Sequence, residues 1–334
     1  MEDLEGLNMS NAFWKNKSVL VTGYEGFLGS HLVNKLVGHG AWVSGLDIKT
    51  RRKETVLSAD VLKRVKIIKG SVENYRLLLK ILKQGKIEYV FHLAATSIVG
   101  EALSGPLKAF STNIQGTWNV LEACRNVQSI RGVIIASSDK AYGTQNKLPY
   151  MEDGPLCGIH PYDVSKSCAD LLSRTYFHTY NLPVVITRCG NIYGPGDFNF
   201  SRLIPDALRC LFLNKTLKIR SDGKFIRDYV YIDDIVSGYT RIAELLNKGN
   251  LSGQVFNLSD EKPMTVVRLL NKLNKLKLGR SKLRFRIMNS AKYEIKEQYL
   301  CSKKARRAMG WRPQYCIEDG LKKTADWYAD YFRK

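Results

Sequence analysis

The stretch that decides the fold is Lys17-Ser-Val-Leu-Val-Thr22, followed at once by Gly23-Tyr-Glu-Gly26-Phe-Leu-Gly29. The apolar run is typical of a buried strand, and the pattern from Ser30 to His39 predicts a helix. Glycines between a strand and a helix let a pyrophosphate approach the backbone and let the helix pack closely on the sheet. The stretch therefore predicts a nucleotide-binding turn, with Gly23, Gly26, Phe27, Leu28 and Gly29 at the ligand.

The alternation of strand and helix continues along the chain. Further strands are expected near residues 42–47, 65–69, 89–93, 133–137 and 184–188, with helical patterns between them. This rhythm favours an α/β fold with a doubly wound, parallel, Rossmann-like sheet.

After Arg188 the rhythm breaks, which predicts a smaller and discontinuous second lobe. Residues 228–233 and 254–258 are strand-like, so the chain is expected to revisit the sheet there. We predict a dinucleotide domain of residues 12–190 plus about 228–261, and a substrate-binding lobe of about 191–227 plus 262–334. The latter includes helices near 266–278 and 317–332, and residues 1–11 form a polar leader. A cleft between the lobes is the expected place for a substrate.

Composition narrows the class of protein. The 334 residues are 44% hydrophobic, and no stretch approaches the roughly 20 apolar residues that cross a bilayer. The seven cysteines are scattered without a C-x-x-C pair, so we expect reduced thiols, no metal site and a cytoplasmic location, with no membrane partner.

The net charge of +21 favours phosphate-bearing partners but does not indicate which kind of partner binds. Residues 262–312 hold 16 Lys and Arg against Glu294 and Glu297. A nucleic-acid-binding protein on a retained dinucleotide fold is therefore an alternative, although this segment lacks the interleaved aromatic residues of a base-stacking platform.

Residues at the ends of later strands suggest the rest of the cofactor site. Asp47 stands where a carboxylate accepts the ribose hydroxyls of NAD and repels the phosphate of NADP, although Lys49, Arg51 and Arg52 keep NADP open. Small residues in His92-Leu93-Ala94-Ala95 would lie beside the cofactor, and Asn113 would tie this strand to the catalytic region. His92 is expected to be a hydrogen-bonded core histidine.

Two further motifs carry the chemistry: Ser138-Asp139-Lys140 after a strand, and Tyr162-Asp163-Val164-Ser165-Lys166 on the next helix. A tyrosine is a poor base at its ordinary pKa of about 10, and a lysine one turn away would stabilise the phenolate. Asp139 and Lys140 add a second proton-transfer set, which simple alcohol oxidation does not require.

In this order the motifs resemble the extended short-chain dehydrogenase/reductase superfamily of NAD-dependent epimerases and dehydratases, over about residues 13–331. Ser138-Asp139-Lys140 is similar to the Thr-Asp-Lys of CDP-glucose 4,6-dehydratases, and Arg202-Leu-Ile-Pro-Asp206 and Leu217-Lys-Ile-Arg220 also resemble these enzymes.

The resemblance implies an NAD-dependent 4,6-dehydratase that acts on a nucleotide sugar, with CDP-glucose favoured. Tyr162 would take the 4-hydroxyl proton, aided by Lys166 and the nicotinamide charge, while Ser138 hydrogen-bonds that oxygen. Lys140, or a group that it activates, would then remove the C5 proton as Asp139 protonates the departing 6-hydroxyl.

The resemblance also implies binding roles for other residues. Ser71 and Val72 would lie at the adenine, and Tyr162 and Lys166 would also contact the cofactor. Five residues are expected at the substrate: Asn191, Arg202, Leu203, Arg220 and Arg227.

Some residues depart from the CDP-glucose pattern. Arg227-Asp-Tyr-Val-Tyr231 has the general epimerase/dehydratase form, and Gly70-Ser71 stands where Gly-Asp is usual. An epimerase or decarboxylase of the same fold, using Tyr162 and Lys166 alone, is therefore the nearest alternative. Helices over about 106–127 and 162–180 carry apolar residues on more than one face, which favours a homodimer.

Overall fold

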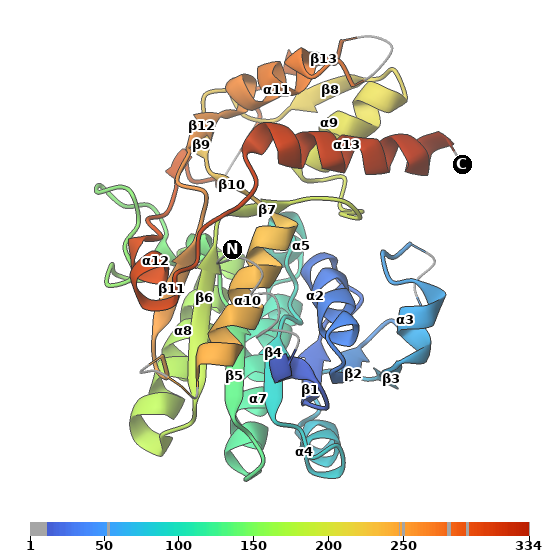
Figure 1. Ribbon diagram of the computed structural model, residues 1–334. Helices are drawn as coiled ribbons and strands as arrows, with labels where there is room; N and C mark the ends of the chain where they lie inside the picture. The colour runs from blue at the N-terminus through green and yellow to red at the C-terminus, as the bar shows by residue number, and fades with distance from the viewer. Residues whose placement is uncertain are drawn as a thin grey trace.

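In this computed structural model, residues 12–51, 54–246, 248, 251–278, 282–291 and 294–333 are described. The expected leader of residues 1–11 and Arg52 lie outside the described residues. The elements form a seven-stranded sheet with helices on both faces and a smaller lobe above its carboxyl edge (Figure 1).

The large sheet is parallel throughout and has the order β11-β6-β5-β4-β1-β2-β3. Its strands are β1 (Ser18–Thr22), β2 (Trp42–Asp47), β3 (Val65–Lys69), β4 (Tyr89–His92), β5 (Gly132–Ala136), β6 (Val184–Cys189) and β11 (Val255–Leu258). The chain runs outward from β1 in both directions, so the strand order reverses between β1 and β4. In such sheets this reversal opens a crevice at the carboxyl ends, where ligands bind. The prediction of a doubly wound sheet is confirmed.

Alternate residues of each strand feed two hydrophobic cores. On β1, Val19 and Val21 pack in the core with α2 (Phe27–Gly38) and α10 (Ile232–Leu246). Leu20 faces the opposite core, under α4 (Tyr75–Gln84), α7 (Gly116–Arg125) and α8 (Pro161–Tyr180). Both faces of the sheet are thus covered, which explains the continuous apolar runs of its strands.

Shorter elements complete the sheet domain. These are α3 (Ala59–Lys63), α5 (Val99–Ser104), α6 (Pro106–Phe110), a π-helical turn (Ser111–Gln115), a 3-10 turn (Asp139–Tyr142) and α12 (Lys303–Met309). The π-helical turn lies between α6 and α7 and points Asn113 into the interior, where it is 2% exposed.

The smaller lobe is built from segments far apart in the sequence. Its elements are α9 (Leu203–Phe212), β8 (Thr216–Ile219), β9 (Ile226–Arg227), β12 (Met264–Thr265), α11 (Val266–Lys275), β13 (Arg284–Ile287), β14 (Glu297–Gln298) and α13 (Ile317–Arg333). β13 pairs with β8, and β9 lies between β12 and β14. The lobe is therefore closed by strand pairings between residues up to 71 positions apart in the sequence.

One expected strand does not rejoin the large sheet. Residues 254–258 do so as β11, but β10 (Tyr229–Tyr231) pairs instead with β7 (Asn191–Tyr193). β11 already occupies the free side of β6, and β7 continues the chain just beyond the end of that strand. β10 pairs with this continuation, so the prediction that residues 228–233 return to the sheet is wrong.

Candidate active site

The glycine turn leaves no room for side chains. Gly23 has φ +71°, and a Cβ atom there would lie 3.0 Å from the backbone of Ala94. A Cβ atom on Gly29 would lie 2.1 Å from the carbonyl oxygen of Gly23. Gly26 precedes α2, and Phe27 and Leu28 form the first turn of that helix. The turn thus presents bare backbone and a helix N-terminus, which fits a pyrophosphate.

Thr22 joins the first strand to the loop after β4. Its hydroxyl oxygen accepts hydrogen bonds from the N–H groups of Leu93 and Ala94, each at 3.2 Å. His92 contacts the Thr22 hydroxyl through Nδ1 at 2.9 Å and the Thr117 hydroxyl through Nε2 at 3.1 Å. Burial lowers the pKa of His92 to about 3, so the ring is neutral. This confirms the interpretation of His92 as a hydrogen-bonded core histidine.

The carboxyl ends of β2 and β3 supply the other side of the cofactor cradle. Asp47 ends β2, is 7% exposed, and accepts a hydrogen bond from the N–H of Lys49 at 3.1 Å. The N–H of Gly70 binds the Asp47 carbonyl at 3.0 Å, so Ser71 and Val72 follow β3 beside Asp47. A carboxylate at this strand end fits a ribose diol and repels an added phosphate.

Asn113 connects the β4 loop to the helix that carries Tyr162. Its Oδ1 accepts from the N–H of Thr96 at 2.8 Å, and its Nδ2 donates to the Thr96 carbonyl at 3.1 Å. The same Nδ2 donates to the Ser165 hydroxyl at 2.9 Å. Because Ser165 belongs to the Tyr162–Lys166 motif, Asn113 fixes that motif against the sheet.

Ser138 and Asp139 form one hydrogen-bonded unit just beyond β5. The Ser138 hydroxyl donates to Asp139 Oδ1 at 2.9 Å and accepts from the N–H of Lys140 at 3.2 Å. Asp139 is 5% exposed, and its other oxygen, Oδ2, is buried without a hydrogen-bond partner among the described residues. Burial raises the pKa of this carboxyl, against the lowering effect of Lys140. Asp139 is thus biased toward the protonated form that a general acid requires.

Tyr162 and Lys166 lie one turn apart on α8, and both are buried. The Lys166 ammonium donates to the carbonyl of Ala136, the last residue of β5, at 2.7 Å. Burial lowers the pKa of Lys166 to about 8 and raises that of Tyr162 to about 12, with the Ser138 hydroxyl acting in the opposite direction on Tyr162. Lys166 therefore does not hold Tyr162 as a phenolate by itself, because desolvation dominates. Ionisation of Tyr162 needs a further positive charge at the site.

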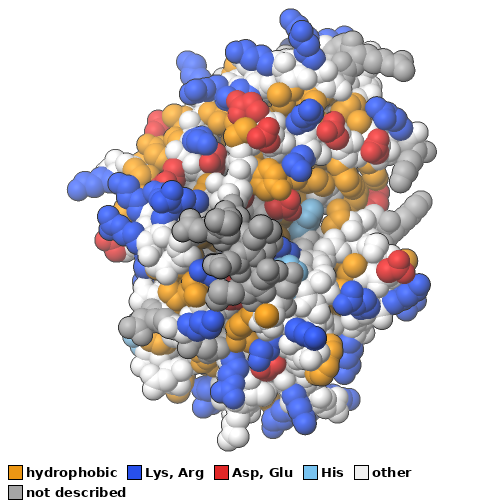
Figure 2. Space-filling model, in the orientation of Figure 1, with side chains coloured by type: hydrophobic (Ala, Val, Ile, Leu, Met, Phe, Trp, Pro, Cys, Tyr) orange, Lys and Arg blue, Asp and Glu red, His pale blue; other side chains and the backbone are white. Residues whose placement is uncertain are grey.

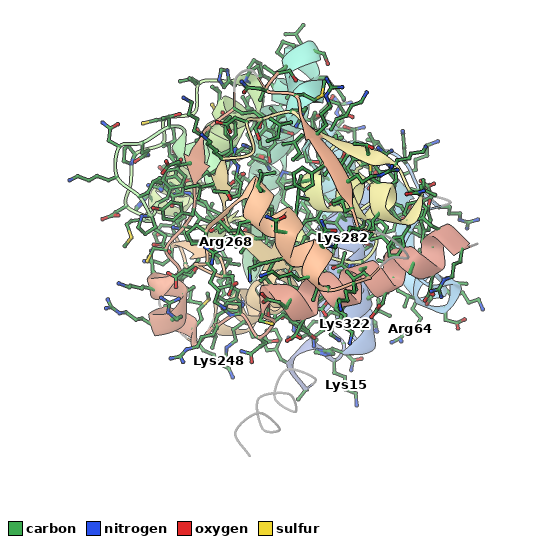
Figure 3. The ribbon with its side chains drawn as sticks, turned by 90° about the horizontal axis from the view of Figure 1, so that it is seen from above. Lys15, Arg64, Lys248, Arg268, Lys282 and Lys322 are labelled. Atoms are coloured by element: carbon green, nitrogen blue, oxygen red, sulfur yellow. The ribbon has the colours of Figure 1, made fainter. Side chains whose placement is uncertain are left out.

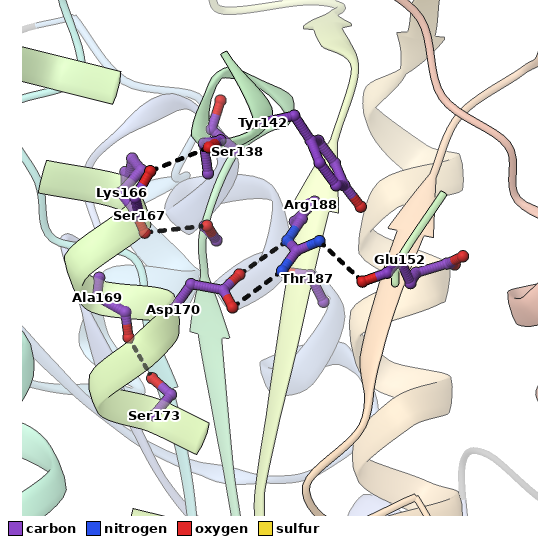
Figure 4. A network of polar contacts seen from close by, with 12 residues as sticks. Ser138, Tyr142, Glu152, Lys166, Ser167, Ala169, Asp170, Ser173, Thr187 and Arg188 are labelled. Carbon is purple, nitrogen blue, oxygen red and sulfur yellow. Dashed lines mark hydrogen bonds and ion pairs between the residues drawn. The ribbon is translucent and has the colours of Figure 1, made fainter. Parts of the chain in front are cut away.

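A buried ion pair fixes α8 to the sheet near the candidate catalytic residues Ser138 and Lys166 (Figure 4). Arg188 on β6 donates through Nε and Nη2 to the two oxygens of Asp170 at 2.8 and 2.9 Å, and both side chains are fully buried. The guanidinium also donates to the Glu152 carbonyl and lies 4.4 Å from the ring centre of Tyr142. Since Tyr142 ends the 3-10 turn that begins at Asp139, this network sets that turn against α8.

The residues expected at the substrate lie in the smaller lobe or at its border. Arg202 and Leu203 start α9, and Arg202 pairs with Asp197 at 3.0 Å. The exposed Arg220 pairs with Glu294 at 3.3 Å. Arg227 is buried and donates to the carbonyls of Ile226, Lys296 and Ile295. Nδ2 of Asn191 donates to the Asp228 carbonyl at 3.2 Å. The binding roles of these residues stay predictions. To bind a phosphate, Arg227 would have to give up its hydrogen bonds to these backbone carbonyls.

The structure adds residues to the site that the sequence did not single out. Gln298 on β14 accepts a hydrogen bond from the Lys140 ammonium at 3.3 Å. Asp228 is fully buried, and burial, followed by the charge of Asp139, raises its pKa to about 7. Asp163, beside Tyr162, is buried and faces Lys140. Asp163 and Asp228 belong to the sequence motifs given above, whereas Gln298 belongs to none of them. Only the fold shows that Gln298 lies at the site.

The surface charge is spread out. Lys and Arg side chains are distributed over both lobes on the face seen in Figure 2. Seen from above, the labelled Lys15, Arg64, Lys248, Arg268, Lys282 and Lys322 come from separate elements around the molecule (Figure 3). Within the described part of the chain there is no group of metal-ligating side chains and no helix long and apolar enough to cross a membrane.

A tyrosine and a lysine one turn apart, held near a strand-end hydroxyl on a dinucleotide-binding sheet, are the arrangement of short-chain dehydrogenases/reductases, and fold and site assign the chain to this class. A family model described as GDP-mannose 4,6 dehydratase matches residues 20–324. The chain therefore belongs to this family of nucleotide-sugar enzymes, within the extended branch of the superfamily.

Similar proteins cover almost the whole chain. It is 30% identical to a CDP-glucose 4,6-dehydratase of Salmonella typhimurium, over 96% of this chain and 93% of that protein. It is also 30% identical to a trifunctional UDP-glucose 4,6-dehydratase/UDP-4-keto-6-deoxy-D-glucose 3,5-epimerase/UDP-4-keto-L-rhamnose-reductase of Arabidopsis thaliana. That match covers 96% of this chain and 48% of the relative, so the chain spans about half the length of the trifunctional protein.

Solved structures of both a dehydratase and an epimerase share the fold. The dTDP-glucose 4,6-dehydratase of Bacillus anthracis, in complex with NAD, has a TM-score of 0.83 and 27% identity, covering 95% of this chain and 98% of that one. The UDP-glucose 4-epimerase of Thermotoga maritima, with UDP-glucose, has a TM-score of 0.84 and 27% identity, covering 94% and 99%.

Proposed function

We propose that this protein is an NAD-dependent nucleotide-sugar 4,6-dehydratase that forms a 4-keto-6-deoxysugar. One observation carries the proposal: Asp139 is buried, with one oxygen bound to Ser138 and the other without a protein partner in the described chain. Burying such an oxygen is unfavourable unless something satisfies it. A substrate hydroxyl that receives the Asp139 proton would supply the missing partner.

The cofactor cradle fits NAD. Gly23 and Gly29 expose backbone for the pyrophosphate, and Asp47 stands at the ribose position. When bound, NAD would accept the C4 hydride of the sugar and return it at C6. The positive charge that Tyr162 needs for ionisation is also one that an oxidised nicotinamide carries, in agreement with the NAD-containing dehydratase structure.

The remaining steps would be carried out by four side chains near the end of β5 and on α8. Tyr162 would take the proton of the 4-hydroxyl. Ser138, whose hydroxyl lowers the pKa of Tyr162 by hydrogen bonding, would hydrogen-bond the same oxygen. The 4-ketone acidifies the C5 proton, which Lys140 would remove while Asp139 protonates the departing 6-hydroxyl. A proton would return to C5, from the Lys140 ammonium, as the hydride is returned to C6. Asp139 and Lys140 extend from one turn beyond β5, so acid and base approach the sugar from the same strand end.

For the substrate we propose a CDP-hexose. Support comes from Ser138-Asp139-Lys140 and from the similarity to the CDP-glucose 4,6-dehydratase. A 4-epimerase is the second candidate, since the UDP-glucose 4-epimerase shares the fold and Tyr229-Val-Tyr231 has the general form. An epimerase does not need an acid and a base at residues 139 and 140.

We also propose that the protein works as a homodimer. The packed helices α5 to α8 each leave a large apolar side chain exposed on the same side of the sheet: Leu103, Leu107, Trp118 and Leu171. Leu107 is 84% exposed, which is costly unless a second copy covers it. The cytoplasmic location stays a prediction.

Asp139→Asn tests the proposed function. Wild-type protein given a panel of nucleotide hexoses should form a product that is lighter by one water. The variant should lower this elimination about 100-fold or more, because a positioned general acid contributes at least that much. C4 oxidation should persist, seen as the near-ultraviolet absorbance of reduced nicotinamide.

The control is Asp153→Asn, an exposed aspartate in a nearby loop, which should eliminate water at the wild-type rate. Products of unchanged mass and altered configuration would make the protein an epimerase. If Asp139→Asn eliminated water at the wild-type rate, Asp139 would not be the general acid.

A further inference from the structure

The proposed reaction places opposite demands on two neighbouring residues. Asp139 must hold a proton and Lys140 must be able to lose one, but an ion pair between them would fix both in the wrong state. In the described chain, Asp139 binds the Ser138 hydroxyl, and Lys140 instead donates to Oε1 of Gln298 at 3.3 Å. The Gln298 side chain also interacts with Asp139, where it lowers the pKa of the carboxyl, so one amide contacts both residues.

Gln298 reaches this position through a short segment fixed on two sides. β14 pairs with β9, with Gln298 opposite Arg227. On its other side, the N–H of Tyr150 binds the Tyr299 carbonyl at 2.9 Å, and the N–H of Cys301 binds the Tyr150 carbonyl at 3.0 Å. Gln298 is 1% exposed, so its amide has little freedom to turn. The contact with Lys140 spans 158 residues of sequence.

An amide suits this position because it is polar but uncharged. Its oxygen accepts a hydrogen bond from an amine in either protonation state. A carboxylate at the same place would hold a proton on Lys140, whereas an apolar side chain would leave the amine free to approach Asp139. Glutamine avoids both outcomes.

We propose that Gln298 is a positioning residue for the Asp139 and Lys140 pair: its buried amide holds the Lys140 amine away from the Asp139 carboxyl without adding charge. The proposal rests on the proposed dehydratase function. Gln298, on β14 of the smaller lobe, would complete the acid and base pair at the end of β5.

Other titratable groups face this pair from every element packed around it. Asp163 and Lys140 interact across the start of α8, and His160 precedes that helix. Around Asp139 the neighbouring groups are Tyr162, Arg227, Asp228, Tyr150 and Cys189. These groups are unchanged in the variants below, so a difference between variants reports on residue 298.

The experiment measures the Lys140 amine directly. Trace acetylation of the full chain with acetic anhydride at pH 8, followed by mass spectrometry of the Lys140 peptide, reports the fraction of neutral amine. Gln298→Glu should lower Lys140 labelling about tenfold, because an opposite charge at this distance shifts an ionisation by about one unit or more. Gln298→Met, which leaves the amine free to pair with Asp139, should lower labelling about threefold.

Activity gives a second, independent readout. Both variants should lower elimination about tenfold or more while C4 oxidation persists, and the elimination lost in Gln298→Glu should partly return at higher pH. The matched control is Glu297→Gln, the reverse change on the exposed neighbour in β14, which should match wild type in both assays.

Lys140 labelling within twofold of wild type in both Gln298 variants would overturn the proposal. Labelling requires no substrate, so it decides the role of Gln298 even if the wild-type protein eliminates water from no nucleotide hexose. That second result would refute the dehydratase function alone. A Gln298→Glu chain that fails to fold leaves Gln298→Met, for which unchanged labelling is equally decisive.

Discussion

Asp228 should make the protein less stable as the pH rises. This aspartate is 0% exposed, and its Oδ2 accepts hydrogen bonds from the Ser259 hydroxyl and from the N–H of Leu300, the latter at 3.1 Å. Its Oδ1 is buried without a partner in the described part of the chain. Burial, followed by the charge of Asp139, raises the pKa of Asp228 from 3.8 to about 7.

The sign follows from proton uptake. Between about pH 4 and pH 7 the folded protein holds a proton on Asp228 that the unfolded chain releases, so lowering the pH favours the folded state. The contribution is fully present below about pH 4 and is lost as the pH rises through about 7. Each pKa unit corresponds to about 1.4 kcal/mol, so this group alone should lower the free energy of unfolding by about 3 kcal/mol between pH 5 and pH 8.

Urea denaturation at pH 5, 6.5 and 8 measures this effect in wild type and in Asp228→Asn. The amide cannot ionise, so the variant should lack about 3 kcal/mol of the pH dependence seen in wild type. Asp326→Asn, an exposed aspartate on α13, is the control and should follow wild type at each pH. If wild type and Asp228→Asn differed by less than about 1 kcal/mol in this dependence, Asp228 would not be a protonated acid in the fold.

Two further predictions concern the ion pair below the site and the glycine turn. Asp170→Asn leaves the buried Arg188 charge without its partner and should lower the free energy of unfolding by about 3 to 5 kcal/mol in urea denaturation. Asp60→Asn, which breaks the exposed pair with Lys63, should leave the unfolding midpoint unchanged. If Asp60→Asn and Asp170→Asn lowered the stability equally, burial would not be what makes the Asp170–Arg188 pair important. Gly29→Ala should weaken NAD binding about tenfold or more by calorimetry, since its Cβ would lie 2.1 Å from the Gly23 carbonyl oxygen and the turn must open. Gly38→Ala, on the same helix with nothing within 4 Å of its Cβ, should bind NAD as wild type does, and unchanged binding by Gly29→Ala would refute the role of the close turn.

Much of the fold was readable because its signals are local. Each apolar run of β1 to β5 is short, and each is followed by a helical period, so the parallel sheet follows from the sequence pattern. Gly23 and Gly29 mark the candidate cofactor turn because Gly23 has a positive φ and a Cβ on Gly29 would collide with the Gly23 carbonyl. The pairing of Tyr162 with Lys166 is likewise local, since helical periodicity places residues four apart on one face.

Pairing partners and ionisation were beyond the sequence. Residues 228–233 were expected to form a strand of the large sheet, but the sequence pattern does not show that β7 is the partner of this strand. The Tyr162–Lys166 spacing suggested an ionised tyrosine, yet burial raises the pKa of Tyr162 to about 12. Burial depends on every element around a side chain, and a spacing rule does not contain that information.

The sequence alone predicted the dinucleotide-binding sheet, the glycine turn and the candidate catalytic side chains, because each depends on residues within a few positions of one another. Only the tertiary structure decided how these side chains are held and charged. In the folded chain, Asp139 is buried and Lys166 donates a hydrogen bond to the last residue of β5. Gln298 contacts Lys140 although the two are 158 residues apart in the sequence. Electrostatic environment and long-range contact arise from packing, so they exist only once the smaller lobe closes on the sheet.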